Sequence, residues 1–483
     1  MTELSLGPFS RVEGDLELRL TCEGGRVVSA LAATPLYRGI EQILEGRPAQ
    51  DALVIAARLC GSCSVSQSMA AAKALGMAIG TRPPANGMIA ANLILACETA
   101  ADHLTHFYLS FMPDFADPAY AGHPWHALAV RRFQAQTGVA AREMEKARVA
   151  FLHAMGILAG RWPHNLAIQP GGTTKSIDLG ERMRLLAVLA DFRRFLETAL
   201  YGDTLEAVAG LSSVADLTRW AEAHGADGAD LPLFLEIAED LGLASLGRGP
   251  DRFLSVGAFG GVEDPLFPAG IWRKGTGNAL DLADLREDLS HTWMSGPNLH
   301  PREGTTLPDA DKPGGYSWCK AVRLSGDSME VGAFARQMIA GHPLIRSMAA
   351  AQGGRATVAG RVVARLLELA ILVPAMERWI RSFAASEPYC LPAPVPERAE
   401  GCGLVEAARG SLGHWLAVEG GRIRRYQIVA PGTWNCSPRD SSCHPGPLEE
   451  ALVGTPVDEG EAMPLPVRHI VRSFNLCLRC AAQ

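Results

Sequence analysis

The pattern of hydrophobic and polar positions changes its period twice along this chain of 483 residues. Near the start, LELRLTCEGGRVVSALAAT alternates apolar and polar residues around a Gly-Gly turn, which predicts a β-hairpin within residues 1–35. Near the end, GHWLAVEGGRIRRYQIVAP has the same alternation. It predicts a second hairpin at the beginning of the region 411–483.

Between these hairpins the pattern has a helical period. Four long segments are rich in Ala, Leu and Met and are apolar over much of their circumference, at 87–112, 139–160, 180–202 and 356–383. Helices with one wet face would be more polar, so we expect a bundle with a thick core. The stretch 223–313 is dense in Gly, Pro and Asp and predicts a loop-rich insertion. The expected fold is mainly α, of the α+β class. It is a single domain over 1–483, with a large buried helical bundle and small peripheral β-hairpins near both ends.

Composition excludes several classes of function. The net charge of −7 gives no positive surface for nucleic acid or for an anionic membrane. No apolar run is long enough to span a bilayer, so we expect no direct membrane insertion. The first residues, MTELSLGPFSRVEGD, contain no basic region followed by an apolar stretch. We therefore expect no secretory signal and a cytoplasmic location.

Two of the chain's cysteine pairs have the spacing of metal ligands. Cys60 and Cys63 lie in RLCGSC, and Cys477 and Cys480 lie in CLRC. A C-x-x-C turn directs both sulfurs toward one ion, and four thiolates suit zinc, an iron cluster or nickel. A zinc ribbon usually has its pairs close together, whereas about four hundred residues intervene here. A shared site would therefore join the beginning of the chain to its end. Structural zinc, buried thiols and a redox pair remain alternatives.

Several motifs in order resemble those of the large subunit of [NiFe]-hydrogenases. They are RLCGSC, CLRC, FSRVEGDLEL, YRGIEQIL, GRWPHNLAIQPGG, EAARGSLGHW and YQIVAPGTWNCSPRD. The segments CSVSQS, DHLTHFYLSFMPDF and EAARGSLGHW are most similar to the hydrogen-sensing, regulatory branch of that family. The resemblance implies the large-subunit fold.

The resemblance also implies a Ni-Fe centre. Cys60, Cys63, Cys477 and Cys480 would hold nickel, and Cys63 and Cys480 would bridge to an iron with cyanide and carbon monoxide ligands. Polarisable thiolates stabilise such low-charge metals. The implied reaction is reversible, heterolytic oxidation of H2, in a sensing or uptake complex. Cys477 would accept the proton.

Further site residues are carried over by the same resemblance. Glu13 matches the proton gate, and Arg409 matches an arginine that lies over the metals, with Asp102 as its partner. Thr433, in the Thr-Trp-Asn segment, is a second cofactor-binding candidate. Glu41 matches a ligand of a nearby magnesium ion, because hard cations prefer oxygen donors.

The sequence departs from the family pattern at several of these places. Asn475, Leu476 and Gln483 stand where the family usually has aspartate, proline and a terminal histidine. Gln483 still offers an oxygen to a metal. Gly432 replaces a hydroxyl residue, and Ser62 and Ser110 replace bulky residues of the gas channel. These changes support an alternative function, a catalytically impaired metal-binding or cofactor-assembly scaffold.

Partners are expected as well. Apart from the two pairs, the chain has no cysteine set for iron-sulfur clusters. Electrons would therefore leave through a small subunit that carries such clusters. The resemblance further implies maturation proteins and, for the sensing branch, a sensory histidine kinase. No nucleic-acid partner is expected.

Overall fold

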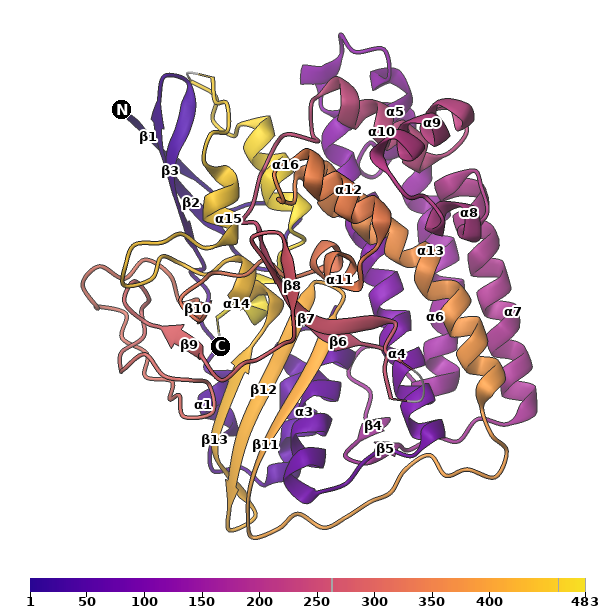
Figure 1. Cartoon of the computed structure of the whole chain (residues 1–483), viewed down its shortest axis with the longest axis vertical. Helices are drawn as coiled ribbons and strands as arrows, with labels where there is room; N and C mark the ends of the chain where they lie inside the picture. The colour runs from indigo at the N-terminus through magenta and orange to yellow at the C-terminus, as the bar shows by residue number, and fades with distance from the viewer. Residues whose placement is uncertain (262–263, 459, 483) are drawn as a thin grey trace.

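Long helices pack side by side in one half of the molecule, and small antiparallel sheets occupy the other half (Figure 1). The computed structural model describes residues 1–261, 264–458 and 460–482. The helices are α1 Ile40–Leu44, α2 Ala52–Ile55, α3 Ser64–Ile79, α4 Ala85–Thr105, α5 His126–Phe133, α6 Val139–Ala159, α7 Leu179–Phe195, α8 Leu205–Ala209, α9 Val214–His224, α10 Asp230–Asp240, α11 Ala333–Ala340, α12 Pro343–Ala351, α13 Val358–Ser382, α14 Pro431–Asn435, α15 Pro447–Leu452 and α16 Leu465–Ser473.

The strands form five small sheets among the described residues. They are β1 Thr2–Leu6, β2 Glu17–Glu23, β3 Arg26–Ala33, β4 Ile168–Gln169, β5 Gly172–Thr173, β6 Arg252–Ala258, β7 Phe267–Arg273, β8 Thr276–Asn278, β9 Leu285–Asp288, β10 Ala321–Leu324, β11 Arg398–Ala407, β12 Gly410–Glu419 and β13 Arg422–Val429. Every ladder between these strands is antiparallel.

The core of the bundle is made by the helices that the sequence predicts. The four apolar segments correspond to α4, α6, α7 and α13, and α13 is buried over most of its length. Helices α4 and α7 each continue into a π-helical turn, at His106–Phe111 and Leu196–Tyr201. The predicted α+β class with a large helical bundle is confirmed.

The sheets at both ends are larger than the predicted hairpins. In the N-terminal sheet β1 pairs with β2, which pairs with β3. In the C-terminal sheet β11 adds a third strand to the predicted β12–β13 hairpin. Every residue of β12 except Glu419 is buried, so this sheet is part of the core rather than a peripheral feature. The stretch 223–313 contains α10 and the sheet β6–β7–β8.

Two glycines allow β11 to lie directly on α3. A Cβ atom on Gly401 would lie 1.9 Å from the carbonyl oxygen of Ala74, and one on Gly403 would lie 1.9 Å from that of Ala70. Any larger residue would therefore push the strand away from the helix. This contact fixes the sheet relative to α3, the helix whose N-cap residue is Cys63.

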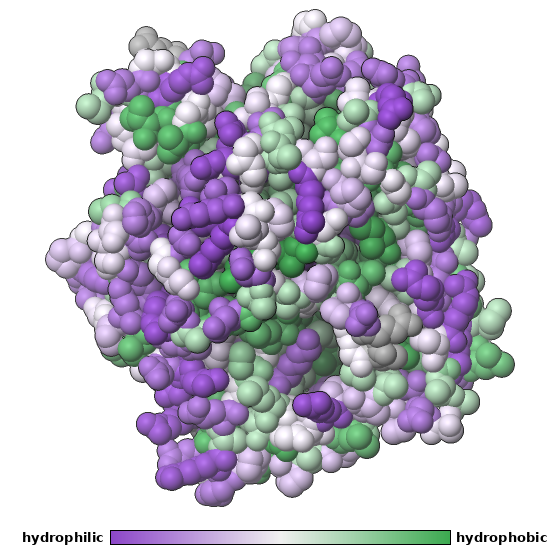
Figure 2. All heavy atoms as spheres, in the orientation of Figure 1, coloured by the Kyte–Doolittle hydropathy of each residue, from purple (hydrophilic) through white to green (hydrophobic). Residues whose placement is uncertain are grey.

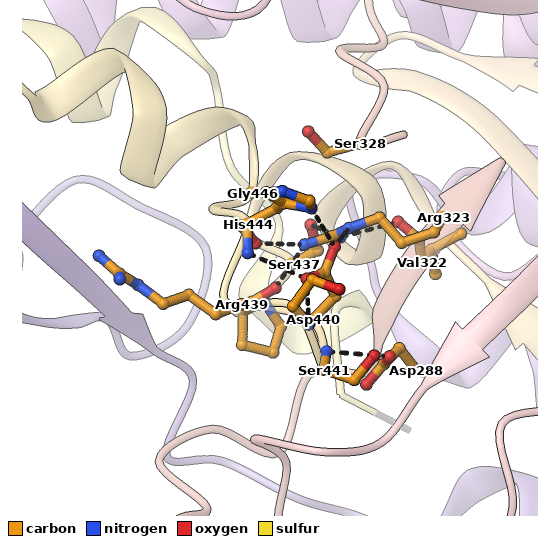
Figure 3. Close-up of polar contacts among 12 residues, drawn as sticks. Asp288, Val322, Arg323, Ser328, Ser437, Arg439, Asp440, Ser441, His444 and Gly446 are labelled. Atoms are coloured by element: carbon orange, nitrogen blue, oxygen red, sulfur yellow. Dashed lines mark hydrogen bonds and ion pairs between the residues drawn. The ribbon is translucent and has the colours of Figure 1, made fainter. Parts of the chain in front are cut away.

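A buried arginine organises the loop that follows α14 (Figure 3). Arg323 of β10 donates to Asp440 at 2.9 Å, to Ser437 at 3.1 Å and to the backbone oxygens of Pro438 and His444. Asp440 also accepts from the backbone amide of His444. Because both charged groups are fully hydrogen-bonded, the loop can be buried.

On the face drawn in Figure 2, hydrophobic side chains are scattered among polar ones, mainly across the middle of the view. Within the described part of the chain, no helix has the length and apolar character needed to cross a membrane.

Candidate metal centre

The four predicted thiols meet at one buried point, although they come from distant parts of the chain. Their sulfur atoms all lie within 4.8 Å of one another. Cys60 and Cys477 are 3.5 Å apart, Cys63 and Cys480 are 3.5 Å apart, and Cys477 and Cys480 are 3.1 Å apart. Cys60, Cys477 and Cys480 are each at most 3% exposed. The donor set therefore fits a soft metal group, with four thiolates directed at one position.

The N-terminus of α3 holds the first pair in place. Cys63 is the N-cap residue of this helix, and the carboxylate of Glu98 accepts from the amides of Val65 and Ser66 at 2.8 and 2.9 Å. Trp162 also donates to Glu98, at 3.2 Å. Burial raises the pKa of Glu98 to about 7, against the lowering effect of these hydrogen bonds. Glu98 thus satisfies the free amides at the helix start, beside the metal loop.

The C-terminal segment is held by the backbone near the start of the chain. The carbonyl oxygen of Glu13 accepts from the amides of Leu478 and Arg479 at 2.8 and 3.2 Å. The amide of Glu13 donates to Leu476 at 3.4 Å. Arg38 also donates to the Arg479 carbonyl oxygen. These bonds order a segment that would otherwise fray.

Gly432 and Thr433 contact the same segment from α14. A Cβ atom on Gly432 would lie 2.5 Å from the carbonyl oxygen of Cys477. A hydroxyl side chain therefore does not fit here with this backbone. The Thr433 hydroxyl donates to the carbonyl oxygen of Ala481 at 3.2 Å. Its role in binding the cofactor stays a prediction.

Arg409 lies beside the thiols, in the turn between β11 and β12. Its Nη2 donates to Asp102 Oδ1 at 2.7 Å, and its Nη1 donates to Ser62 Oγ at 3.1 Å. Asn475 does not bind Arg409 but donates to Asp102 Oδ2 at 2.8 Å. Ser62 Oγ is also 3.1 Å from Cys60 Sγ. The structure thus brings together Arg409 and Asp102, as the resemblance implies, and adds Ser62 and Asn475.

Charge is distributed unevenly over this cluster. Hydrogen bonds within the thiol group, above all that from Cys477, lower the pKa of Cys60 well below its ordinary value. Burial raises the pKa of Cys480. Burial alone would lower the pKa of Arg409, but Asp102 and the neighbouring thiolates raise it well above its ordinary value. The guanidinium therefore stays charged beside the thiols.

A buried polar chain next to Cys63 and Cys480 was not predicted from the sequence. Gln67 Nε2 lies 3.9 Å from Cys63 Sγ and 3.8 Å from Cys480 Sγ. Its oxygen is 2.8 Å from His414 Nε2, and His414 Nδ1 is 2.8 Å from the Tyr426 hydroxyl. Burial lowers the pKa of His414 to about 3, so this ring is neutral. Two features of the sequence could have indicated this chain of polar residues: Gln67 lies one helical turn after Cys63, and His414 is the histidine of the RGSLGHW motif.

A small cavity of about 120 Å³ adjoins Arg409. It is lined by Arg11, Val12, Glu13, Thr105, His106, Ser110, Arg409, Arg472, Asn475 and Leu476. His106 is 2% exposed, and its Nε2 donates to the Arg472 carbonyl oxygen at 2.7 Å. The predicted proton gate Glu13 thus shares one polar space with Arg409. Ser110, predicted at the gas channel, lines the same cavity.

The predicted magnesium ligand Glu41 lies in a different cluster. Its carboxylate pairs with the Lys320 ammonium at 3.1 Å and accepts from the amide of Ile428 at 2.8 Å. Lys320 also pairs with Glu287 at 3.1 Å. A lysine thus meets both carboxylates, and the predicted magnesium site stays a prediction. Gln483 lies outside the described residues.

Comparison with known proteins adds independent evidence. Residues 38–132 and 142–483 match the family described as nickel-dependent hydrogenase. The chain is 28% identical to the periplasmic [NiFeSe] hydrogenase large subunit of Desulfomicrobium baculatum, over 99% of this chain and 94% of that one. It is 27% identical to the hydrogenase-2 large chain of Escherichia coli, over 99% and 96%. The solved [NiFeSe] hydrogenase of D. vulgaris Hildenborough superposes with a TM-score of 0.84 at 29% identity, and each chain is covered completely.

Proposed function

This chain belongs to the nickel-dependent hydrogenase family, and we propose that it is the large subunit of a hydrogenase that carries a Ni-Fe centre and reversibly oxidises H2. It is a hydrogenase, an oxidoreductase acting on H2. The observation that carries the proposal is the convergence of four thiols within 4.8 Å, three of them buried, beside the fixed guanidinium of Arg409.

Cys60, Cys63, Cys477 and Cys480 would hold the metals. When bound, this group supplies soft, low-charge metals with cyanide and carbon monoxide ligands, at which H2 can be polarised and cleaved.

The chain itself would position charge and move the proton. Arg409 is held rigidly by Asp102 and Ser62, so its positive charge is already oriented before the reaction. Cys477 Sγ would accept the proton. Glu13 would receive it next, because its backbone is bonded on both sides of Cys477 and it lines the cavity beside Arg409.

Electron transfer requires a partner. The four clustered cysteines are the single group of three or more candidate metal ligands among the described residues. We therefore propose a small subunit with iron-sulfur clusters as the electron acceptor. The relatives reported above are named large subunit and large chain, which agrees with such a pairing.

Hydrogen sensing, with a histidine kinase downstream, is the finer form of the proposal. Its support is the motif likeness in CSVSQS and DHLTHFYLSFMPDF. The relatives reported above are named as a periplasmic enzyme and as hydrogenase-2, which gives sensing no support over uptake. Slow turnover with a kinase bound would favour sensing, and fast turnover with a respiratory acceptor would favour uptake.

The test is metal analysis of the purified complex with infrared spectroscopy under hydrogen and under argon. Nickel and iron, with cyanide and carbon monoxide bands that shift under hydrogen, support the proposal. Hydrogen-dependent dye reduction then measures turnover. A fully loaded complex without dye reduction would identify the chain as a scaffold. Zinc or no metal, and no bands, would contradict the proposed function.

A further inference from the structure

Ser62 lies between the guanidinium of Arg409 and the sulfur of Cys60. Its hydroxyl oxygen is 3.1 Å from Arg409 Nη1 and 3.1 Å from Cys60 Sγ. A guanidinium can only donate, so the Ser62 oxygen accepts from Arg409. The hydroxyl hydrogen is then free to point at Cys60, and a thiolate bound to a metal can only accept. The direction of the chain of hydrogen bonds is therefore fixed from Arg409 through Ser62 to Cys60.

Asn475 explains why Arg409 uses a second partner. The two oxygens of Asp102 are divided, because Oδ1 accepts from Arg409 and Oδ2 accepts from Asn475. Asp102 therefore does not form a bidentate pair with both Nη atoms of the guanidinium. Arg409 is 7% exposed, so Nη1 cannot readily turn to bulk water. Ser62 supplies the acceptor that Nη1 needs.

We propose that Ser62 is a positioning residue for the hydrogen chemistry of this site. It fixes Arg409 beside the thiols and donates a hydrogen bond to the Cys60 sulfur. This inference rests on the proposed function. A hydrogen bond to a ligand sulfur withdraws electron density and raises the reduction potential of the bound metals. Ser62 thus tunes the metals as well as the arginine.

The experiment compares three variants in the complex with the partner subunit. Ser62→Ala removes the hydroxyl, and Ser62→Thr keeps it at the same place. Ser68→Ala is the matched control, because Ser68 lies on α3, the helix that follows Ser62, and its buried hydroxyl has no hydrogen-bond partner among the described residues. Nickel and iron content, the infrared bands, the midpoint potential and kcat/KM are measured for each.

Ser62→Ala is expected to retain both metals. Its cyanide and carbon monoxide bands should move to lower frequency and its potential should become more negative. Its kcat/KM should fall by roughly tenfold, the scale of one hydrogen bond to a charged group. Ser62→Thr should restore the bands, the potential and kcat/KM, and Ser68→Ala should match the wild type.

If a metal-loaded Ser62→Ala complex has the infrared bands and the midpoint potential of the wild type, the role of Ser62 is overturned. The proposed function is then left intact. If Ser62→Ala takes up no metal, Ser62→Thr decides. Wild-type bands in that variant support the role, and altered bands contradict it. A wild-type complex without metal bands removes the proposed function and this inference with it.

Discussion

Asn475 alters how the charges around Arg409 are balanced. Where the family pattern has an acid, the amide nitrogen of Asn475 donates to Asp102 at 2.8 Å. Asp102 of α4 therefore accepts from two sides, from Arg409 in the β11–β12 turn and from Asn475 in the C-terminal segment. A carboxylate at position 475 would lose the donor and place a second negative charge next to Asp102.

Asn475→Asp should therefore destabilise the protein, by about 1–3 kcal/mol for the loss of a buried hydrogen-bond donor. Thermal unfolding of the complex would show a lower Tm. The double variant Asp102→Asn with Asn475→Asp restores one donor and one acceptor, so it should recover part of the loss. An unchanged or higher Tm for Asn475→Asp would mean that Arg409 moves between the two carboxylates, which contradicts the present account.

At this scale the sequence predicted the residues whose spacing is itself informative. The C-x-x-C pairs identified the four thiols. The contacts of Ser62, Gln67 and Asn475 could not be predicted, because each depends on which of several polar groups a short side chain meets in the folded protein. The bond from the Thr433 hydroxyl to Ala481 depends on the fold in the same way.

At the scale of elements, α14 determines how closely the C-terminal segment can approach. Gly432 is in contact with two of its residues, because an added Cβ would lie 2.5 Å from the Cys477 oxygen and 3.0 Å from the Ala481 Cβ. Gly432→Ala should displace the segment at a cost of about 1–3 kcal/mol and reduce nickel content. Metal analysis and limited proteolysis of the C-terminus would measure both effects.

Gly156→Ala is the control for that variant. Gly156 lies in α6, and an added Cβ would meet no atom within 4 Å. Because glycine disfavours a helix by about 1 kcal/mol relative to alanine, this change should leave nickel content unaltered and stability equal or slightly higher. Equal nickel content in the two variants would show that the close approach at Gly432 is unimportant.

The elements themselves were largely predictable where their apolar faces are long. Four helices matched their apolar periods, because thick cores require such faces over many turns. Strand β11 was missed, since its sequence EGCGLVEA contains glycines in place of apolar residues. The contact with α3 requires these glycines, and they interrupt the alternation of apolar and polar residues that would have predicted a strand.

At the scale of the whole molecule, one buried ionic network connects the helices to the turn that carries Arg409. Arg336 of α11 donates to Glu368 of α13 at 2.7 Å and to the carbonyl oxygens of Ala407 and Ala408 at 2.9 and 3.0 Å. His103 of α4 is 3.1 Å from Glu368. The bundle therefore holds the β11–β12 turn through side chains that are fully buried.

This network predicts a pH dependence of stability. Burial alone would raise the pKa of Glu368, but Arg336 and His103 lower it from its ordinary value of 4.5 to about 2. A carboxyl with a lowered pKa stabilises the fold above its unfolded pKa, and this stabilisation is lost as the pH falls toward 2. The difference between the two pKa values corresponds to about 3 kcal/mol in the free energy of unfolding.

Glu368→Gln should therefore lower the Tm most above pH 5, and the difference from the wild type should shrink steadily between pH 4.5 and 2. The exposed Glu236 on α10 provides the control, because Glu236→Gln removes the same charge from the surface. Glu368→Gln should also lose part of its H2 oxidation activity at neutral pH, because Arg409 lies in the turn that Arg336 holds in place. A constant difference in Tm from pH 7 to pH 2.5 would mean that Glu368 is not ionised in the folded protein. The network would then hold the turn through neutral hydrogen bonds alone.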